Sequence, residues 1–178
     1  MLGFALGSIP FGVVVAKRLG VDIKQHGSGN IGATNVTRVL GLIPGAIVLA
    51  LDVAKGALAV WLARGCTDWV IAAVGFAAIL GHCFSPWLGG RGGKGVATAL
   101  GVFLVISPPL TGIAVLVFGA VLALSKIPAL GSLAGVMTIA LILVYRTERP
   151  FATLALATAL LLVYTHRTNL AKLKINLK

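Results

Sequence analysis

The sequence has few charged residues and very few acidic ones. Of its 178 residues, 11% are charged and 58% hydrophobic, and only 4 are Asp or Glu. An ordinary soluble domain carries about 25% charged residues, so this composition excludes a surface that faces water on all sides. The shortage of acids also leaves too few carboxylates for a plausible catalytic triad.

Cysteine is scarce as well, and the common catalytic motifs are missing. Cys66 and Cys83 are isolated, with no C-x-x-C spacing, which argues against a disulfide framework or a cysteine metal site. Neither H-E-x-x-H nor G-x-S-x-G occurs, so a zinc hydrolase and a serine hydrolase elbow are excluded. The first apolar run lacks a basic start, so we expect no cleavable signal peptide.

Apolar runs separated by charged or Gly/Pro-rich breaks fill most of the sequence. They predict an all-α integral membrane protein with one polytopic domain over residues 1–178. The net charge of +11 then indicates basic loops facing anionic lipids rather than a nucleic-acid partner. The predicted spans are 2–16, 39–63, 69–88, 96–106, 110–125, 129–145 and 150–165.

The run from 96 to 125 is either one kinked helix or two crossings, because Ser107, Pro108 and Pro109 interrupt it. Seven spans place eleven basic residues inside and three outside, whereas six spans leave eight against six. The positive-inside rule therefore favours seven transmembrane helices, with the N-terminus outside and the C-terminus cytoplasmic. The eleven are Lys17, Arg18, Lys24, Arg38, Arg91, Lys94, Lys126, Arg167, Lys172, Lys174 and Lys178, and the three are Arg64, Arg146 and Arg149.

The 96–106 run is short for a crossing, since eleven helical residues rise only about 16 Å. We therefore expect the glycine-rich loop before it to dip into the membrane, which is tolerated where backbone lines a polar cavity.

Two glycine-rich stretches look like nucleotide motifs but lack their context. GSGNIG (27–32) matches G-x-G-x-x-G, yet charged VDIKQH precedes it and no α/β alternation is present, so a dinucleotide fold is excluded. In LGGRGGKGVAT (88–98), Leu88 stands where a P-loop needs glycine, and Gly95 follows Lys94 where Ser or Thr is required.

Both stretches still suit an anion. Glycines let backbone N–H groups converge as a nest, Arg91 and Lys94 add charge, and a helix beginning near Val96 offers its positive end. The alternative is that both stretches are simply flexible, solvated loops. Short polar groups and a further cation accompany the first stretch: Ser28, Asn30, Thr34, Asn35 and Arg38.

A third polar cluster, with His166, Arg167 and Asn169, follows the last predicted span. In the seven-span topology all three clusters lie at the cytoplasmic face. We therefore expect a negatively charged ligand with two phosphate-like groups.

Other polar residues fall within the predicted spans. Asp52 and Lys55 are three residues apart on one helix face and are expected to form an ion pair inside the bundle rather than contact substrate. His82 is expected to be a hydrogen-bonded packing residue, with a place in the cavity as the alternative. The Gly/Ala repeats of spans two, four and five predict close helix packing, and Trp61, Trp69 and Trp87 are expected to anchor at the membrane interfaces.

Five stretches together resemble the acyl-phosphate:glycerol-3-phosphate acyltransferases of bacterial membranes. The resemblance implies a seven-span enzyme of the inner membrane with its active site facing the cytoplasm. Such an enzyme moves a fatty acyl group from acyl phosphate to the sn-1 hydroxyl of glycerol 3-phosphate, giving lysophosphatidic acid and phosphate, without cofactor or metal. The stretches are GSIPFG (7–12), GSGNIGATNV (27–36), LDVAKG (51–56), GGKGVATALGV (93–103) and HRTNLAKL (166–173).

The family motifs map onto individual residues of this sequence. Ser28, Thr34 and Arg38 match the first motif, Gly92, Gly93, Lys94 and Gly95 match a phosphate-binding loop, His166 and Asn169 match the third motif, and Ser132 falls at a polar position after the fifth span. We expect catalytic roles for Ser28, Arg38, Lys94, His166 and Asn169. Substrate binding is expected from Gly27, Gly29, Asn30, Thr34, Asn35, Arg91, Gly92, Gly93, Gly95 and Ser132.

Acyl phosphate is already activated, so positioning and electrostatic stabilisation would suffice for the reaction. The mechanism of acyltransferases that use His followed five residues later by Asp is excluded, because those positions hold Ile31, Trp87 and Ala171. The base is either His166, which has a suitable intrinsic pKa, or the substrate's own phosphate with a second pKa near 6. We favour substrate assistance, with His166 as a hydrogen-bonding positioner.

The resemblance suggests an enzyme that acts as a monomer on acyl phosphate and glycerol 3-phosphate. Two other classes of function are alternatives to it. An organic-phosphate transporter would also need basic loops and broken helices, but it predicts polar groups at mid-membrane and an inverted repeat, neither of which the sequence indicates. A purely structural membrane subunit leaves the three polar clusters unexplained.

Overall fold

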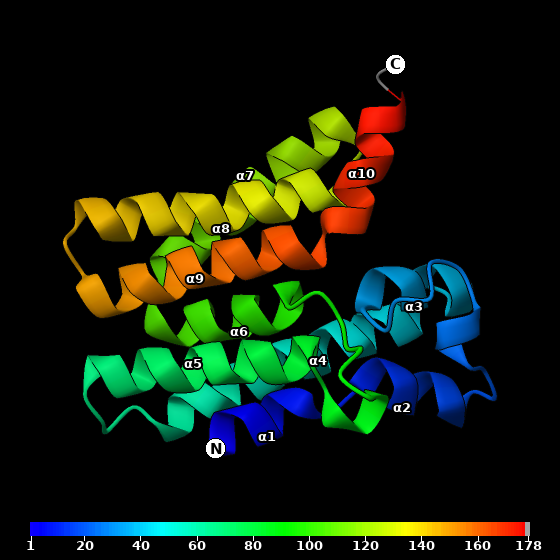
Figure 1. Cartoon of the computed structure of the whole chain (residues 1–178), viewed down its shortest axis with the longest axis horizontal. Coiled ribbons are helices and arrows are strands. Elements are labelled where there is room, and N and C mark those ends of the chain that lie inside the picture. Colours follow the sequence, from blue (N-terminus) through cyan, green and yellow to red (C-terminus); the bar gives the residue numbers. More distant parts are fainter. Residues whose placement is uncertain (177–178) are drawn as a thin grey trace.

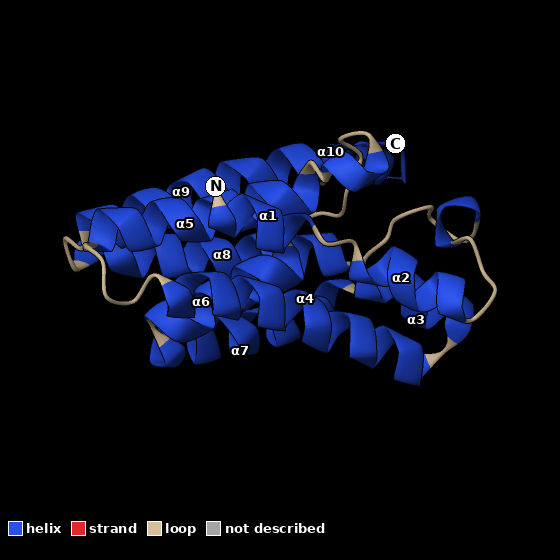
Figure 2. Cartoon of the chain, turned by 90° about the horizontal axis from the view of Figure 1, so that it is seen from below, coloured by secondary structure: helices blue, strands red, loops and turns tan. Residues whose placement is uncertain are grey.

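In the part that the structure, a computed structural model, describes, which is residues 1–176 with side chains to residue 171, every secondary-structure element is a helix, and loops and turns join the helices (Figures 1 and 2). Lys178 lies outside the described residues, as do the side chains of Lys172 and Lys174. The elements are α1 (Leu2–Ser8), α2 (Phe11–Arg18), η1 (Ile23–Gln25), α3 (Ala33–Leu40), α4 (Leu42–Leu62), α5 (Asp68–Cys83), η2 (Pro86–Leu88), α6 (Val96–Ile106), α7 (Pro108–Ser125), α8 (Pro128–Tyr145), α9 (Arg149–Thr165) and α10 (Arg167–Asn176).

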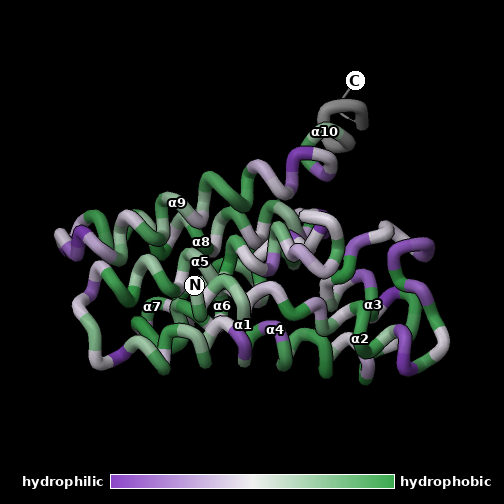
Figure 3. Tube along the Cα trace, turned by 60° about the horizontal axis from the view of Figure 1, so that its bottom comes forward, coloured by the Kyte–Doolittle hydropathy of each residue, from purple (hydrophilic) through white to green (hydrophobic). Residues whose placement is uncertain are grey.

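The helices form a bundle whose outer surface is largely apolar. Neighbouring helices pair as α1 with α5, α4 with α6, α7 with α8, and α8 with α9. Three helices of the described chain, α4, α7 and α8, together with α5 continued through η2, are long and apolar enough to cross a membrane, and α6 and α9 are shorter apolar helices. Hydrophobic segments run along the bundle, while hydrophilic segments gather toward its ends (Figure 3). This distribution suits a bilayer, in which only the ends of a bundle meet water.

Glycines let two of the helix pairs approach closely. A Cβ at Gly56 or Gly101 would overlap backbone across the α4–α6 interface, and one at Gly7 would overlap Ala78 of α5. The predicted close packing is therefore confirmed for spans two and four. It is wrong for the glycines of α7, since Gly112 and Gly119 have no neighbour within 4 Å of an added Cβ among the described residues.

The first predicted span is not continuous, because the helix stops at Ser8 and resumes at Phe11. Pro10 lacks a backbone N–H, so carbonyl groups are left without helical partners at the break. The Lys55 ammonium donates to Ile9 O at 2.8 Å, and the Ser85 hydroxyl donates to Ser8 O at 2.6 Å. These bonds satisfy backbone oxygens in an interior where an unpaired carbonyl would be costly.

At Ser107 the run from 96 to 125 divides into two separate helices. Ser107 has extended φ and ψ of −150° and 87°, and Pro108 begins α7. The helices then pack on different partners, α6 on α4 and α7 on α8. A single kinked helix is therefore excluded.

Helix α3 lies where the sequence pattern predicts a loop. It follows Gly32 and ends at Gly41, whose φ of +93° separates it from α4. Its side chains include Thr34, Asn35 and Arg38, so residues expected on a flexible loop are held on a helix that packs against α4.

Candidate active site

The three polar clusters meet at one end of the bundle, as predicted. Helices α3 and α10 and the loop that precedes α6 lie at the same end in Figure 1. A cavity of about 790 Å³ opens between them. Its polar lining consists of Ser28, Asn30, Thr34, Asn35, Thr37, Arg38, Asp52, His82, Lys94, Thr111, Lys126, Ser132, His166 and Asn169.

Direct contacts join the loop before α6 to the C-terminal cluster. Lys94 Nζ donates to Asn169 Oδ1 at 2.6 Å, and Thr165 Oγ1 donates to Lys94 O at 3.0 Å. These residues are about seventy positions apart in sequence, so tertiary packing creates this part of the site.

Lys94 is a half-buried cation close to a second cation. Burial lowers the pKa of its ammonium below the usual range, and the charge of Arg38 lowers this pKa further. Two positive groups that disfavour each other are stabilised by an anion bound between them. The pair therefore suits a phosphate group.

Helix α6 points its N-terminus at the same place. Gly95, Val96 and Ala97 line the cavity, and Gly95 caps the helix with a φ of +89°. The first N–H groups of a helix have no partner within it, and its dipole favours a negative charge there.

The N–H groups of Gly92 and Gly93 are not part of this anion site, contrary to the predicted glycine nest. They donate to Cys83 O at 2.9 Å and to His82 O at 3.0 Å. They therefore hold the loop against the C-terminal end of α5 instead of facing a ligand. A Cβ at either glycine would overlap His82, which is why the close approach requires glycine.

Arg91 is also outside the cavity. Its side chain is exposed and is not among the lining residues. Gly27 and Gly29 likewise do not line it; their φ values of +62° and +70° shape the loop instead. The prediction that these residues contact substrate has no support in the arrangement of the site.

Asn35 organises the loop from 26 to 30 rather than facing a ligand freely. Its Oδ1 accepts from Ser28 N–H at 2.8 Å, and its amide nitrogen donates to His26 O and Asn30 O. These bonds use both of its amide hydrogens. Although Asn35 lies on the cavity wall, its geometry favours positioning Ser28 and Asn30 over direct binding.

His166 is a buried, oriented imidazole at the end of α9, with only 3% of its surface exposed. Its Nδ1 lies 2.9 Å from Leu162 O. A carbonyl only accepts, so Nδ1 carries the hydrogen and, in the neutral ring, Nε2 is an acceptor. Burial lowers the pKa of His166; the bond to Leu162 O opposes this and the charge of Lys94 adds to it. The ring is therefore neutral at pH 7.

The remaining predicted site residues differ in how much of the side chain is exposed. Ser28, Thr34, Arg38 and Asn169 line the mouth of the cavity and are exposed. Ser132 is buried in α8, where its hydroxyl donates to Pro128 O at 2.9 Å.

Arg167 turns away from the site, because its guanidinium donates to Tyr164 O and lies over the Tyr164 ring.

Three ionisable cavity residues were not among the predicted site residues. Lys126 ends α7 in a left-handed conformation, and Asp52 and His82 line the inner wall. Lys55 Nζ lies 2.7 Å from Asp52 Oδ1, which confirms the predicted ion pair, and 2.9 Å from His82 Nδ1. His82 is thus both hydrogen-bonded and on the cavity wall.

The other part of the cavity is apolar and lies between helices. Its walls come from α4, α6, α7 and α8 and include Leu49, Leu100, Phe103, Val115 and Phe118. A cationic, hydrogen-bonding mouth followed by a hydrocarbon-lined interior fits a ligand with an anionic head and a long apolar tail.

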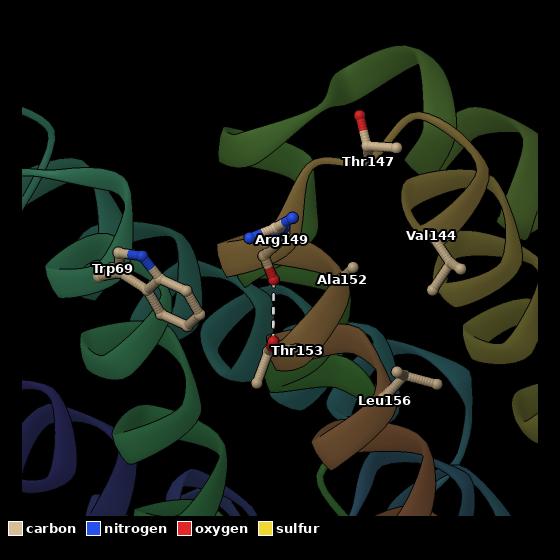
Figure 4. Close-up of a pocket in the computed structure, with 7 residues that line it drawn as sticks. All are labelled: Trp69, Val144, Thr147, Arg149, Ala152, Thr153 and Leu156. Carbon is tan, nitrogen blue, oxygen red and sulfur yellow. Dashed lines mark hydrogen bonds between the residues drawn. The ribbon is translucent and has the colours of Figure 1, made fainter.

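A second pocket, of about 380 Å³, lies at the other end of the bundle (Figure 4). It has one cation, Arg149, whose backbone oxygen accepts from the Thr153 hydroxyl at 2.8 Å. Within the described part of the chain no acid, histidine or second cation lines it, so these residues do not supply the groups for phosphate chemistry.

No group of three or more His, Cys, Asp or Glu side chains that could hold a metal is present among the described residues.

Comparison with known proteins gives a consistent family match. The sequence model of the family described as glycerol-3-phosphate acyltransferase matches residues 1–175. A glycerol-3-phosphate acyltransferase from Myxococcus xanthus is 49% identical, over 97% of this chain and 93% of the relative. One from Thermus thermophilus is 43% identical, over 98% of this chain and 89% of the relative.

Solved structures agree with this match. Two crystal structures of PlsY, an integral membrane glycerol 3-phosphate acyltransferase, are 37% identical to this chain and cover 98% of it and 89% of their own chains. The glycerol 3-phosphate form superposes with a TM-score of 0.93, and the lysophosphatidic acid form with 0.92.

Proposed function

The chain belongs to the glycerol-3-phosphate acyltransferase family, and we propose that it transfers a fatty acyl group from acyl phosphate to the sn-1 hydroxyl of glycerol 3-phosphate. The products are lysophosphatidic acid and inorganic phosphate. The observation that carries the donor assignment is one cavity that has three cations, Arg38, Lys94 and Lys126, at its mouth and an apolar interior between helices. Acyl phosphate has the matching shape, an anionic head on a hydrocarbon tail.

The cationic mouth binds both phosphate groups in this proposal. Lys94 and the N-terminus of α6 hold the phosphate of glycerol 3-phosphate. Ser28, Asn30 and Arg38 hold the head of acyl phosphate, where they stabilise the oxyanion and the departing phosphate. Asn169 orients substrate through its bond to Lys94, and Thr34 and Ser132 line the path between mouth and interior.

The reaction requires little covalent chemistry from the protein. The glycerol hydroxyl attacks the acyl carbonyl, its proton is removed, and phosphate leaves with the electrons of the carbon–oxygen bond. Holding two reactants in line and stabilising the developing negative charge supply most of the acceleration in such a site.

The hydroxyl proton has two possible acceptors, the phosphate of the substrate and His166 Nε2. The lowered pKa of His166 makes its ring a weak base but an available hydrogen-bond acceptor. We therefore favour transfer to substrate phosphate, with His166 orienting the hydroxyl. Complete loss of turnover in His166→Gln, with both substrates still bound, would assign the base to His166 instead.

The membrane arrangement proposed for this activity has seven crossings within one polytopic domain, 1–178. The N-terminus lies outside, the C-terminus and the cavity mouth face the cytoplasm, and the chain acts as a monomer in the bacterial inner membrane. The basic residues of the predicted inner loops support this orientation, as does the separation of α6 from α7 at Ser107.

Purified protein in detergent, given acyl phosphate and glycerol 3-phosphate, should release inorganic phosphate and form lysophosphatidic acid in equal amounts. Detergent removes the two compartments that a transporter needs, so turnover there separates an enzyme from an organic-phosphate transporter. Release of phosphate that does not depend on glycerol 3-phosphate would contradict the proposed acceptor.

A further inference from the structure

His82 belongs to a buried network beside the cavity that the proposed reaction does not yet use. Asp52, Lys55 and His82 are each at most 4% exposed. Lys55 Nζ contacts Asp52 Oδ1 at 2.7 Å, His82 Nδ1 at 2.9 Å and Ile9 O at 2.8 Å. An unpaired charge buried in an apolar helix bundle is costly, so the carboxylate and ammonium balance each other.

The network determines which nitrogen of His82 carries the hydrogen. Two groups lie near Nδ1, Lys55 Nζ at 2.9 Å and Asp52 Oδ1 at 3.5 Å. The shorter contact has normal hydrogen-bond length, whereas the longer one is at the limit. An ammonium only donates, so Nδ1 accepts and the hydrogen of the neutral ring is on Nε2.

The Nε2–H group lies beside the phosphate-binding loop. An added Cβ at Gly93 would overlap Nε2, so this nitrogen lies directly against the residue that precedes Lys94. His82 also lines the cavity. Among the described residues Nε2 makes no hydrogen bond, and it is not one of the fully buried polar atoms that lack a partner. This nitrogen of an otherwise buried side chain therefore keeps some accessible surface. A donor with accessible surface and no protein partner is free to bind a ligand in the cavity.

We propose that His82 is a further substrate-binding residue, whose Nε2–H donates to a phosphoryl oxygen of the glycerol 3-phosphate bound at Lys94. This inference rests on the proposed function, because that function places the phosphate at this loop. Lys55 strengthens the donor, since a cation bonded to Nδ1 withdraws electrons from the ring and makes the Nε2–H group more polar. Asp52 and Ile9 O hold Lys55 in place, so their effect on substrate is indirect.

Two substitutions separate this role from a purely structural one. An Asn side chain places its amide near the position of Nδ1, and a Gln side chain places its amide near Nε2. His82→Asn therefore keeps an acceptor for Lys55 and loses the donor to substrate, whereas His82→Gln keeps the donor and weakens the contact with Lys55. Turnover and KM for glycerol 3-phosphate are measured for both variants, with thermal unfolding as the control for folding.

We expect His82→Asn to lose about 10–10² in kcat/KM for glycerol 3-phosphate, the usual cost of one hydrogen bond to a charged group. His82→Gln should retain at least ten times the activity of His82→Asn. The reverse order, or wild-type activity in both variants, would overturn the proposal and leave His82 as the partner of Lys55 alone. Wild-type turnover in the same assay is the test of the proposed function itself, so the two failures are distinguishable.

If both variants are inactive or unfolded, a nuclear magnetic resonance measurement on the wild-type protein tests the proposal. Nitrogen-15 labelling of histidine reports the tautomer of each ring, and the His82 signal is assigned by its absence from either variant or from His82→Ala. Added glycerol 3-phosphate should shift the protonated Nε2 signal of His82 while Nδ1 stays unprotonated. A signal that does not move at saturating glycerol 3-phosphate, or a ring protonated at Nδ1, contradicts the proposal.

Discussion

Individual side chains in this molecule acquire their roles from burial and from their hydrogen-bond partners. Lys94 and Arg91 are cations of the same glycine-rich loop, yet one is half-buried and bonded to Asn169 while the other is exposed and outside the cavity. His166 is neutral because burial lowers its pKa, and its Nε2 is the acceptor because Nδ1 donates to Leu162 O. Residue type alone does not distinguish these cases.

The two loop cations should therefore respond differently to the same substitution. In the proposed mechanism Lys94→Ala removes the charge that binds the substrate phosphate, so we expect kcat/KM to fall by about 10²–10³. Arg91→Ala should stay within about threefold of wild type. Phosphate release at several concentrations of glycerol 3-phosphate measures both. Equal losses in the two variants would mean that Arg91 also reaches the substrate.

Activity should depend on pH through the neutral ring of His166. The acceptor form exists above the pKa of this residue, and burial and Lys94 lower that pKa from its ordinary value of about 6.5. We therefore expect kcat/KM to be constant above pH 6.5 and to fall only below it, as protonation converts Nε2 from an acceptor into a donor.

The substrate phosphate titrates near pH 6 as well, so the same profile in His166→Gln is the control. The part of the acid limb that persists in this variant belongs to the substrate. A limb in the wild type that lies above pH 6.5 would contradict the lowered pKa.

At the scale of elements, short helices and loops are fixed by close backbone contacts. The loop before α6 is tied to the end of α5 through Gly92 and Gly93, and the break between α1 and α2 is tied to α4 through Lys55. Helix α3 packs on α4 at Gly45, where an added Cβ would overlap Thr37 Oγ1 and lie 2.8–2.9 Å from Thr37 Cβ and Cα. The position of Arg38 thus depends on a glycine of the neighbouring helix.

Gly45→Ala should consequently impair activity although Gly45 carries no polar side chain. The methyl group would push α3 away from α4 and displace Arg38 from Lys94, so we expect kcat/KM to fall at least tenfold. Gly119→Ala in α7, where no neighbour lies within 4 Å, is the matched control and should keep wild-type activity. If Gly45→Ala is equally active, the α3–α4 contact does not set the geometry of the site.

At the scale of the whole molecule, the cavity joins an aqueous end of the bundle to its hydrocarbon interior. The polar mouth lies among α3, α10 and the loop before α6, and the apolar section runs between α4, α6, α7 and α8. From Lys126 at the mouth to Val115 on the same helix is about 16 Å along the axis. A long acyl chain can therefore extend into this section while its reacting carbonyl stays at the mouth.

Blocking the apolar section should shorten the acyl chains that the enzyme accepts. Val115 lines the cavity and is 47% exposed, whereas Leu116 of the same helix does not line it and is 74% exposed. We expect Val115→Trp to reduce kcat/KM at least tenfold for a long-chain acyl phosphate and much less for a short-chain one.

Leu116→Trp should leave kcat/KM unchanged for both the long-chain and the short-chain acyl phosphate. Rates with donors of several chain lengths measure the effect, and a uniform loss across all lengths in Val115→Trp would argue that the chain does not occupy this section.

The sequence by itself determined the all-helical membrane architecture, because long apolar runs and a shortage of charge leave few other solutions. It also indicated the three polar clusters, since charge and short polar groups stand out in such a chain. Ser28, Lys94 and His166 could be predicted as site residues from the sequence, because each lies in a short motif of neighbouring residues.

Only the tertiary structure decided which of those groups share a cavity. It places Arg91 outside the cavity lining and Lys126 and His82 within it, and it bonds the N–H groups of Gly92 and Gly93 to carbonyl oxygens at the end of α5. Helix α3 and the break at Pro10 escaped prediction because each is stabilised by contacts with α4 that no local pattern contains.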